Sequence, residues 1–157
     1  MIENKLKRLL RSGGTAVGTM VCDTRTPAIA QALAVAGFDY FILDTEHGSY
    51  GLETISDMMV VARLAGITPI VRVPDYSYPF IARMLDAGAL GVMVPRVRTR
   101  AQVEEIVRGG GLPSGTHVLD VQTLKAWRDK GMRLLLYSYD FGLIMSGGAA
   151  AIKELRA

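Results

Sequence analysis

The pattern that decides the fold is clearest in residues 55–74, ISDMMVVARLAGITPIVRVP. An amphipathic run, ISDMMVVARLA, leads into Gly66 and then into the β-rich apolar run ITPIVRVP. Gly66 stands where the C-terminal cap of a helix favours a residue that adopts positive φ without strain. The stretch therefore predicts a helix, a tight glycine turn and a buried strand.

The same order of helix, glycine, strand and polar loop recurs along the chain. The glycines that precede strands are Gly37, Gly66, Gly88 and Gly131, and Gly111 supplies a weaker repeat before the run GTHVLD. Apolar strands that alternate with amphipathic helices predict a parallel sheet covered by helices. We count six strand–helix units, whereas a closed (β/α)₈ barrel needs eight strands and about 250 residues. A doubly wound sheet and a shortened barrel both fit this count.

Composition narrows the class of protein. A chain of 157 residues, 50% of them hydrophobic, predicts one domain over residues 1–157. The net charge of +3 comes from Lys and Arg scattered among acids, so we expect no nucleic-acid partner. A single cysteine, Cys22, excludes an internal disulfide framework and favours a cytoplasmic protein. No stretch is long and apolar enough to predict a membrane span.

Polar residues follow the predicted strands, and in both parallel architectures ligand sites lie at the carboxyl ends of strands. The stretch FILDTEHGSYG, residues 41–51, contributes Asp44, Glu46 and His47, and TPIVRVP contributes Arg72. Asp44 lies three residues before His47, close enough to orient the imidazole as a general base.

A purely structural interpretation of the same residues remains open. Asp44 would then cap the loop, and the His47 imidazole would bond a backbone carbonyl. Arg72 would form an ion pair with Asp44 or Asp86 on a neighbouring unit, because a buried guanidinium needs a carboxylate from the protein or from a ligand.

Three motifs in order, GFDYFILDTEHGSYG, TPIVRVP and MLDAGALGVMVPRV, resemble the HpcH/HpaI family of metal-dependent class II pyruvate aldolases. The resemblance resumes at about Gly111 and runs to the end of the chain. It implies a TIM-type (β/α) barrel and the reversible cleavage of a 2-keto-4-hydroxy acid to pyruvate and an aldehyde. It also implies a divalent cation, Mg²⁺ or Mn²⁺, and a homo-oligomer, usually a hexamer with exchanged terminal helices.

The resemblance assigns roles residue by residue. His47 matches the acid/base histidine of the family, and Asp44 matches the carboxylate near it. Arg72 matches the arginine that holds the carboxylate and keto oxygen of pyruvate. Asp86, in the run LDAGA, matches an aspartate associated with the histidine, within one chain or across a subunit boundary. Glu46 lies within the motif, but neither the pattern nor the resemblance assigns it a role.

The sequence departs from the family where the metal ligands belong. The family holds its cation with a Glu in a QIE strand and an Asp in a GPxDLS strand, the fifth and sixth of the barrel, and this sequence has neither motif. Asp44, Glu46 and Asp140 are conceivable oxygen ligands, but none matches a ligand position of the family.

About two strand–helix units are therefore missing near residues 108–111, where RGGG joins the two halves. The middle of a longer aldolase is omitted from this sequence, or it is truly deleted, or partner chains complete the barrel; we favour the first explanation. If residues 108–111 are consecutive, neighbouring Cα atoms lie about 3.8 Å apart. The alternative to an active lyase is a catalytically inactive binding or assembly module derived from the same barrel.

Overall fold

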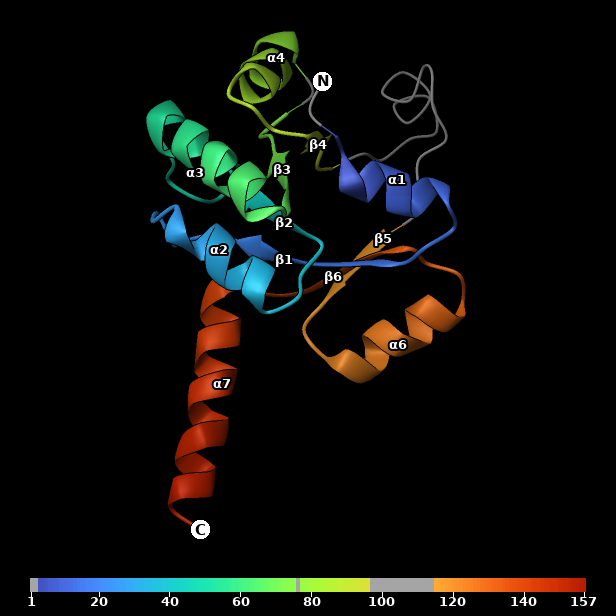
Figure 1. The fold of residues 1–157 in the computed structure, drawn as a ribbon, viewed down its shortest axis with the longest axis vertical. Coiled ribbons are helices and arrows are strands. Elements are labelled where there is room, and N and C mark those ends of the chain that lie inside the picture. The colour runs from blue at the N-terminus through green and yellow to red at the C-terminus, as the bar shows by residue number, and fades with distance from the viewer. Residues whose placement is uncertain (1–2, 76, 97–114) are drawn as a thin grey trace.

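The computed structural model describes residues 3–75, 77–96 and 115–157. Strands and helices alternate along the chain (Figure 1). The strands are β1 (Ala16–Val21), β2 (Tyr40–Asp44), β3 (Thr68–Arg72), β4 (Gly91–Met93), β5 (Gly115–Val118) and β6 (Leu134–Tyr139). The helices are α1 (Lys5–Arg11), α2 (Ala28–Val35), α3 (Leu52–Ala65), α4 (Tyr78–Asp86), α6 (Val121–Asp129) and α7 (Asp140–Leu155).

All six strands form one parallel sheet in the order β4-β3-β2-β1-β6-β5. The last strand of the chain thus pairs with the first, as closure of a (β/α) barrel requires. The sheet is an arc of a barrel, with β4 and β5 at its two open edges. A closed eight-stranded barrel would place its fifth and sixth strands between these edges, so the prediction of a shortened TIM-type barrel is confirmed. Residues 108–111, to which the predicted Cα spacing refers, lie outside the described residues.

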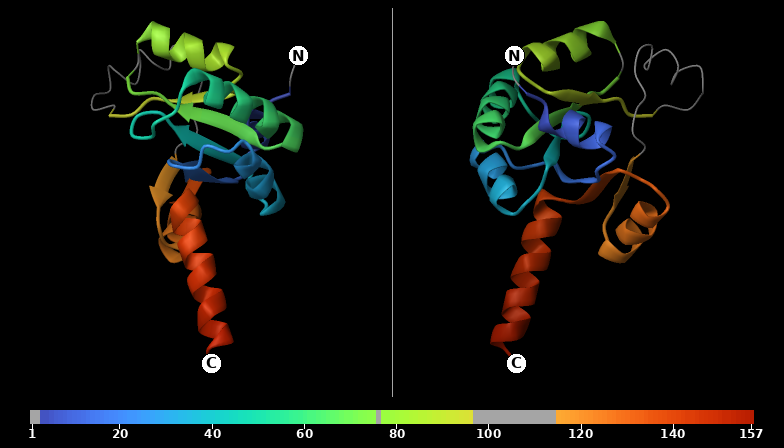
Figure 2. Two further views of the ribbon diagram at one scale, coloured as in Figure 1. Left: turned by 90° about the vertical axis from the view of Figure 1, so that its left-hand side faces the viewer. Right: turned by 45° about the vertical axis from the view of Figure 1, so that its right-hand side comes forward.

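Two apolar layers hold the arc together. On its concave side, Met20, Tyr40, Ile42, Ile70 and Leu136 pack with Leu6 of α1. On its convex side, residues such as Phe41, Leu43 and Val71 pack against α2, α3 and α4, which cover that face in Figure 2. Strand side chains alternate between the two faces. Asp44 and Arg72 therefore share the concave face with Ile42 and Ile70, one step nearer the carboxyl end of the sheet.

The turns agree with the glycine pattern. Gly37, Gly66, Gly88 and Gly131 all have positive φ, between 80° and 104°. The weaker repeat predicted in the run GTHVLD contains β5 (Gly115–Val118), and Asp120 at its end caps α6 by accepting a 2.7 Å hydrogen bond from the Thr123 N–H. The positions of these turns and of the helix cap were thus predictable from single residues.

Helix α7 leaves the body of the molecule in every view (Figures 1 and 2). Its apolar side chains remain exposed, among them Ile144 at 60% and Leu155 at 82%. Among the residues that the structure describes, none of the helices has the length and apolarity needed to cross a membrane.

Candidate active site

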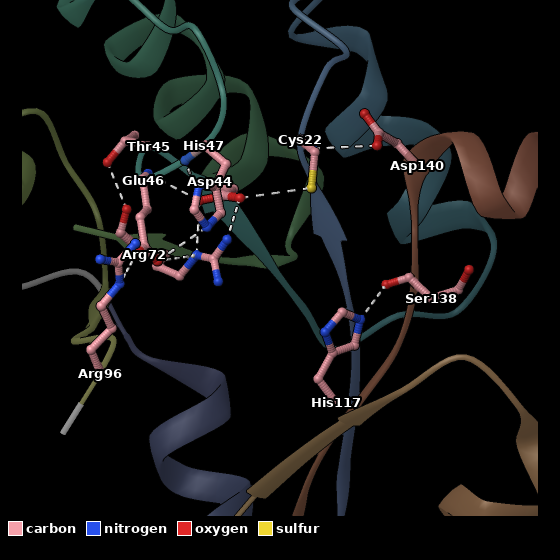
Figure 3. A network of polar contacts seen from close by, with 10 residues as sticks. All are labelled: Cys22, Asp44, Thr45, Glu46, His47, Arg72, Arg96, His117, Ser138 and Asp140. Atoms are coloured by element: carbon pink, nitrogen blue, oxygen red, sulfur yellow. Dashed lines mark hydrogen bonds and ion pairs between the residues drawn. The ribbon is translucent and has the colours of Figure 1, made fainter. Parts of the chain in front are cut away.

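A cluster of charged side chains lies at the carboxyl ends of β2, β3 and β4 (Figure 3). We call Asp44, Glu46, Arg72 and Arg96 the charge cluster. Asp44 and Arg72 are partners in the register of the β2–β3 pair. The Arg72 Nε donates to Asp44 Oδ1 at 2.8 Å, and Nη2 bonds Asp44 Oδ2. Because the Asp44 side chain is 2% exposed and that of Arg72 is 18% exposed, this is a largely desolvated, bidentate ion pair.

Glu46 joins the second arginine to this pair. Its side chain is only 6% exposed; one oxygen lies 3.4 Å from the Arg72 Nε, and the other lies 2.7 Å from the Arg96 Nε. Arg96 has a φ of 58°, which is uncommon for a residue with a side chain. Four side chains of alternating charge therefore cross the top of three strands.

The environment keeps Asp44 ionised. Burial opposes the charge, but the Arg72 hydrogen bond and the backbone N–H donors of His47 and Glu46 outweigh it, so the pKa of Asp44 lies below its usual value. The same hydrogen bond raises the pKa of Arg72. Burial, followed by the nearby charge of Asp44, raises the pKa of the Cys22 thiol to about 11. The thiol is thus protonated at neutral pH and donates to Asp44 Oδ2 at 3.9 Å.

The structure corrects the expected pairing of Asp44 with the His47 imidazole. Asp44 Oδ1 accepts from the backbone N–H of Glu46 at 3.0 Å and of His47 at 3.2 Å. The carboxylate beside the imidazole is Glu46, 3.8 Å from Nε2. Asp44 follows its strand directly and both its oxygens face Arg72 and the turn, so its geometry is that of a loop cap. The imidazole, 62% exposed, faces the open side of the cluster.

The chain does not bring Asp86 to His47. Asp86 is the exposed last residue of α4. The turn after it leads to Leu90, whose N–H donates to the Pro69 carbonyl near the amino end of β3. His47 lies beyond the carboxyl end of β2, so the two side chains lie at opposite ends of the sheet.

The carboxylates at this edge do not fit a cation site. Both oxygens of Asp44 and both of Glu46 face arginine nitrogens, and those of Asp140 accept three backbone N–H groups. In residues 3–75, 77–96 and 115–157, no group of three His, Cys, Asp or Glu side chains is placed to hold a metal ion. Asp44 and Asp140 are thus held by donors of the protein, and Glu46 lies between two guanidinium groups, a surrounding that does not resemble the oxygen cage that Mg²⁺ or Mn²⁺ prefers.

Asp140 organises the other flank of the site. Its carboxylate is 2% exposed and accepts from the backbone N–H groups of Cys22 at 3.3 Å, Asp23 at 3.1 Å and Thr24 at 2.8 Å. We call residues 22–24 with Asp140 the Asp140 turn. Burial opposes the charge of Asp140, but these donors hold its pKa below the usual value.

Sequence reasoning left Glu46 without a role and did not connect it with Arg96. Glu46 lies in the same short loop as His47, and Arg96 directly follows the run VMVP after a predicted strand. Their position after parallel strands was a usable signal, because carboxyl ends of neighbouring strands meet at one edge. Nothing in the spacing indicated that Glu46 would be buried between two guanidinium groups.

Sequence comparison places this cluster within a known family. The profile of the HpcH/HpaI aldolase/citrate lyase family matches residues 20–113, more than half of the chain. A hydroxypyruvate/pyruvate aldolase of Roseobacter denitrificans is 34% identical over 110 residues, which cover 70% of this chain and 43% of that protein. A 5-keto-4-deoxy-D-glucarate aldolase of Klebsiella pneumoniae is 31% identical with the same coverage. The chain thus spans about two fifths of the length of these relatives.

Solved structures agree in fold. The crystal structure of an HpcH/HpaI aldolase from Desulfitobacterium hafniense superposes with a TM-score of 0.85 at 21% identity, covering 96% of both chains. The citrate synthase SbnG has a TM-score of 0.59 at 29% identity, covering 85% of this chain and 54% of its own. With its fold, its motifs and the family profile in agreement, the chain belongs to the HpcH/HpaI aldolase/citrate lyase family.

Proposed function

We propose that this protein takes part in aldehyde-lyase chemistry, cleaving a 2-keto-4-hydroxy acid to pyruvate and an aldehyde in a reversible aldol reaction. The observation that carries the proposal is the Asp44–Arg72 ion pair beside His47. It holds a guanidinium rigidly at the carboxyl edge of the sheet, next to an accessible imidazole. The names of the two aldolases above agree with this reaction class.

Arg72 would bind the keto acid. Asp44 occupies Nε and one side of Nη2, which leaves the edge formed by Nη1 and the outer hydrogen of Nη2 for a ligand. A carboxylate and the adjacent keto oxygen match that edge. When the bond between C3 and C4 breaks, its electrons pass to the enolate oxygen on C2, where the guanidinium stabilises the developing charge.

His47 would move the proton. Its imidazole accepts the C4 hydroxyl proton as the aldehyde leaves, and then returns a proton to C3 of the enolate to give pyruvate. The Glu46 carboxylate lies 3.8 Å from Nε2, on the side of the ring away from its backbone. Asp44 acts indirectly, by holding Arg72 and the backbone of the His47 loop.

The family resemblance assigns two further contributions to groups that the charge cluster does not supply. A divalent cation, Mg²⁺ or Mn²⁺, would add charge at the enolate; its ligands would come from outside the described residues. Asp86 would approach the His47 of another copy rather than its own. Mixing His47→Gln and Asp86→Asn subunits tests this second point, because a site shared between copies regains activity in the mixture and a site within one chain does not.

We also propose a homo-oligomer in which α7 docks on a second copy. The helix exposes the apolar side chains of Phe141, Ile144, Ile152 and Leu155. An exposed apolar face of this kind is typical of a protein–protein contact. A groove of about 420 Å³ between α6 and the outer faces of β1 and β6, lined by Val17, Leu135 and other side chains, has room for a few of these apolar side chains of a second copy. Light scattering of the full chain and of a chain ending at residue 143 tests this assembly.

The activity test measures pyruvate release from a 4-hydroxy-2-keto acid, with Mn²⁺, with Mg²⁺ and with a chelator. We expect release that falls about 10²-fold or more in His47→Gln and about 10²–10³-fold in Arg72→Lys. His117→Gln is the matched control: the other histidine of the chain bonds the Ser138 carbonyl at 3.0 Å and lies apart from the cluster in Figure 3.

If the folded chain releases no pyruvate with Mn²⁺, with Mg²⁺ or with a chelator, the proposed lyase activity is contradicted. This result would favour an inactive binding or assembly module that keeps the surfaces of the barrel. Pyruvate affinity separates the two functions further, because Arg72→Lys weakens pyruvate binding only if Arg72 still holds a keto acid.

A further inference from the structure

We infer that Asp140 is a positioning residue for the active site, and that it couples the projecting helix α7 to the loop of His47. The proposed lyase activity enters only one of the tests below. Asp140 is the first residue of α7, yet its buried carboxylate binds the loop that follows β1, 116–118 positions earlier in the chain.

The bonds themselves are the first step. One Asp140 oxygen accepts from Cys22, and the other accepts from Asp23 and Thr24. Three successive N–H groups thus converge on one carboxylate, a cradle that resembles an anion-binding nest with the anion supplied by the protein. The shape of residues 22–24 depends on this carboxylate, because those N–H groups have no other acceptor among the described residues.

The second step links this turn to His47. The Thr24 carbonyl accepts from the Tyr50 hydroxyl at 3.3 Å, and the Cys22 thiol reaches Asp44 at 3.9 Å. Gly48, which follows His47, lies directly on the Cys22 carbonyl: a Cβ there would lie 2.6 Å from that oxygen. The loop after β1 therefore forms a wall against which the His47 loop is packed.

The third step concerns α7. Beyond its first turn the helix is exposed, from Ile144 to its end, so its direction depends on whatever it packs against. Its only buried residue is Asp140. A rotation of α7 would move the carboxylate, then residues 22–24, and then the His47 loop. Assembly through α7 would in this way set the geometry of the site.

The experiment compares Asp140→Asn with Asp120→Asn in the full chain. Each variant replaces a carboxylate that accepts backbone N–H groups, but Asp120 caps α6, outside the site and the Asp140 turn. In Asp140→Asn, we expect the amide resonances of Thr24, Glu46 and Gly48 to move in ¹⁵N spectra. In Asp120→Asn, only resonances near Thr123 should move.

The kinetic arm uses the same pair of variants. We expect Asp140→Asn to lower kcat for pyruvate release about 10²-fold, as misplacement of a proton-transfer group does. KM should stay within about twofold, because the ligand-binding edge of Arg72 is untouched. Asp120→Asn should keep both constants.

Two results would overturn the inference. One is an Asp140→Asn chain that melts earlier while the Glu46 and Gly48 amides, kcat and KM stay at wild-type values, since the residue would then be merely structural. The other is equal displacement of those amides by both variants. A wild-type chain without activity refutes the proposed lyase instead, and the amide shifts still decide the role of Asp140.

Discussion

The two flanks of the site neutralise buried charge in different ways. In the charge cluster, the carboxylates of Asp44 and Glu46 face guanidinium groups. In the Asp140 turn, one carboxylate faces three backbone N–H groups. If the charge cluster loses an arginine, a buried carboxylate is left without a cation. If the Asp140 turn loses its carboxylate, three backbone N–H groups are left without an acceptor. The difference predicts a ranking of mutational costs.

The largest effect is expected in the charge cluster. Arg72→Met leaves Asp44 buried and unpaired and should lower the free energy of unfolding by about 3–5 kcal/mol, measured by urea denaturation. The double variant Asp44→Leu with Arg72→Met should recover part of this loss, because it removes both charges. A single-variant cost below about 1 kcal/mol would mean that the pair is solvated and the contrast between the flanks is wrong.

The Asp140 turn should come second. Asp140→Ala leaves its N–H donors without an acceptor and should cost about 2 kcal/mol. Asp120→Ala, which removes an exposed helix cap, should cost less than Asp140→Ala. Equal urea midpoints for the two variants would argue that burial adds nothing to the Asp140 turn.

Arg96 allows a finer test, because its guanidinium is exposed while its partner is buried. Arg96→Met should cost about 1 kcal/mol, since Glu46 loses a charged hydrogen bond. Arg128→Met, which breaks an ion pair exposed on both sides, should change stability by less than about 0.5 kcal/mol. If Arg96→Met and Arg128→Met change the free energy of unfolding by the same amount, the burial of Glu46 does not strengthen its ion pair with Arg96.

The smallest effect is expected for mild acidification. The pKa values of Asp44 and Asp140 are both lowered in the folded protein. Their contribution to stability is therefore complete above the unfolded-state value, about 3.9, and is lost as pH falls through the folded-state values. If Asp44 and Asp140 alone set the pH dependence, the urea midpoint of unfolding should be the same at pH 7 and pH 5. The midpoint should be lower at pH 3. Asp44→Asn should show a smaller fall at pH 3.

The two flanks also differ in how far sequence predicted them. Asp44 and Arg72 follow neighbouring strands, so the period of the pattern was enough to bring them to one edge, and the possible ion pair between them is confirmed. The shortened barrel followed from counting glycine-punctuated units. From the sequence, Asp140 was only a conceivable metal ligand. Its bonds to residues 22–24 depend on β6 pairing with β1, a closure that the resemblance to a barrel implies but the periodicity does not encode. Burial of Glu46 likewise depends on three strands at once.

Gly48 limits how such a site can change over generations. A Cβ at this position would lie 2.3 Å from the Asp44 carbonyl and 2.6 Å from that of Cys22, and both obstacles are backbone. Every other amino acid carries a Cβ, so any substitution of Gly48 brings this atom too close to the two carbonyl oxygens. Changes at this end of the sheet would therefore fall on exposed positions such as Arg96, while the residue beside His47 stays glycine.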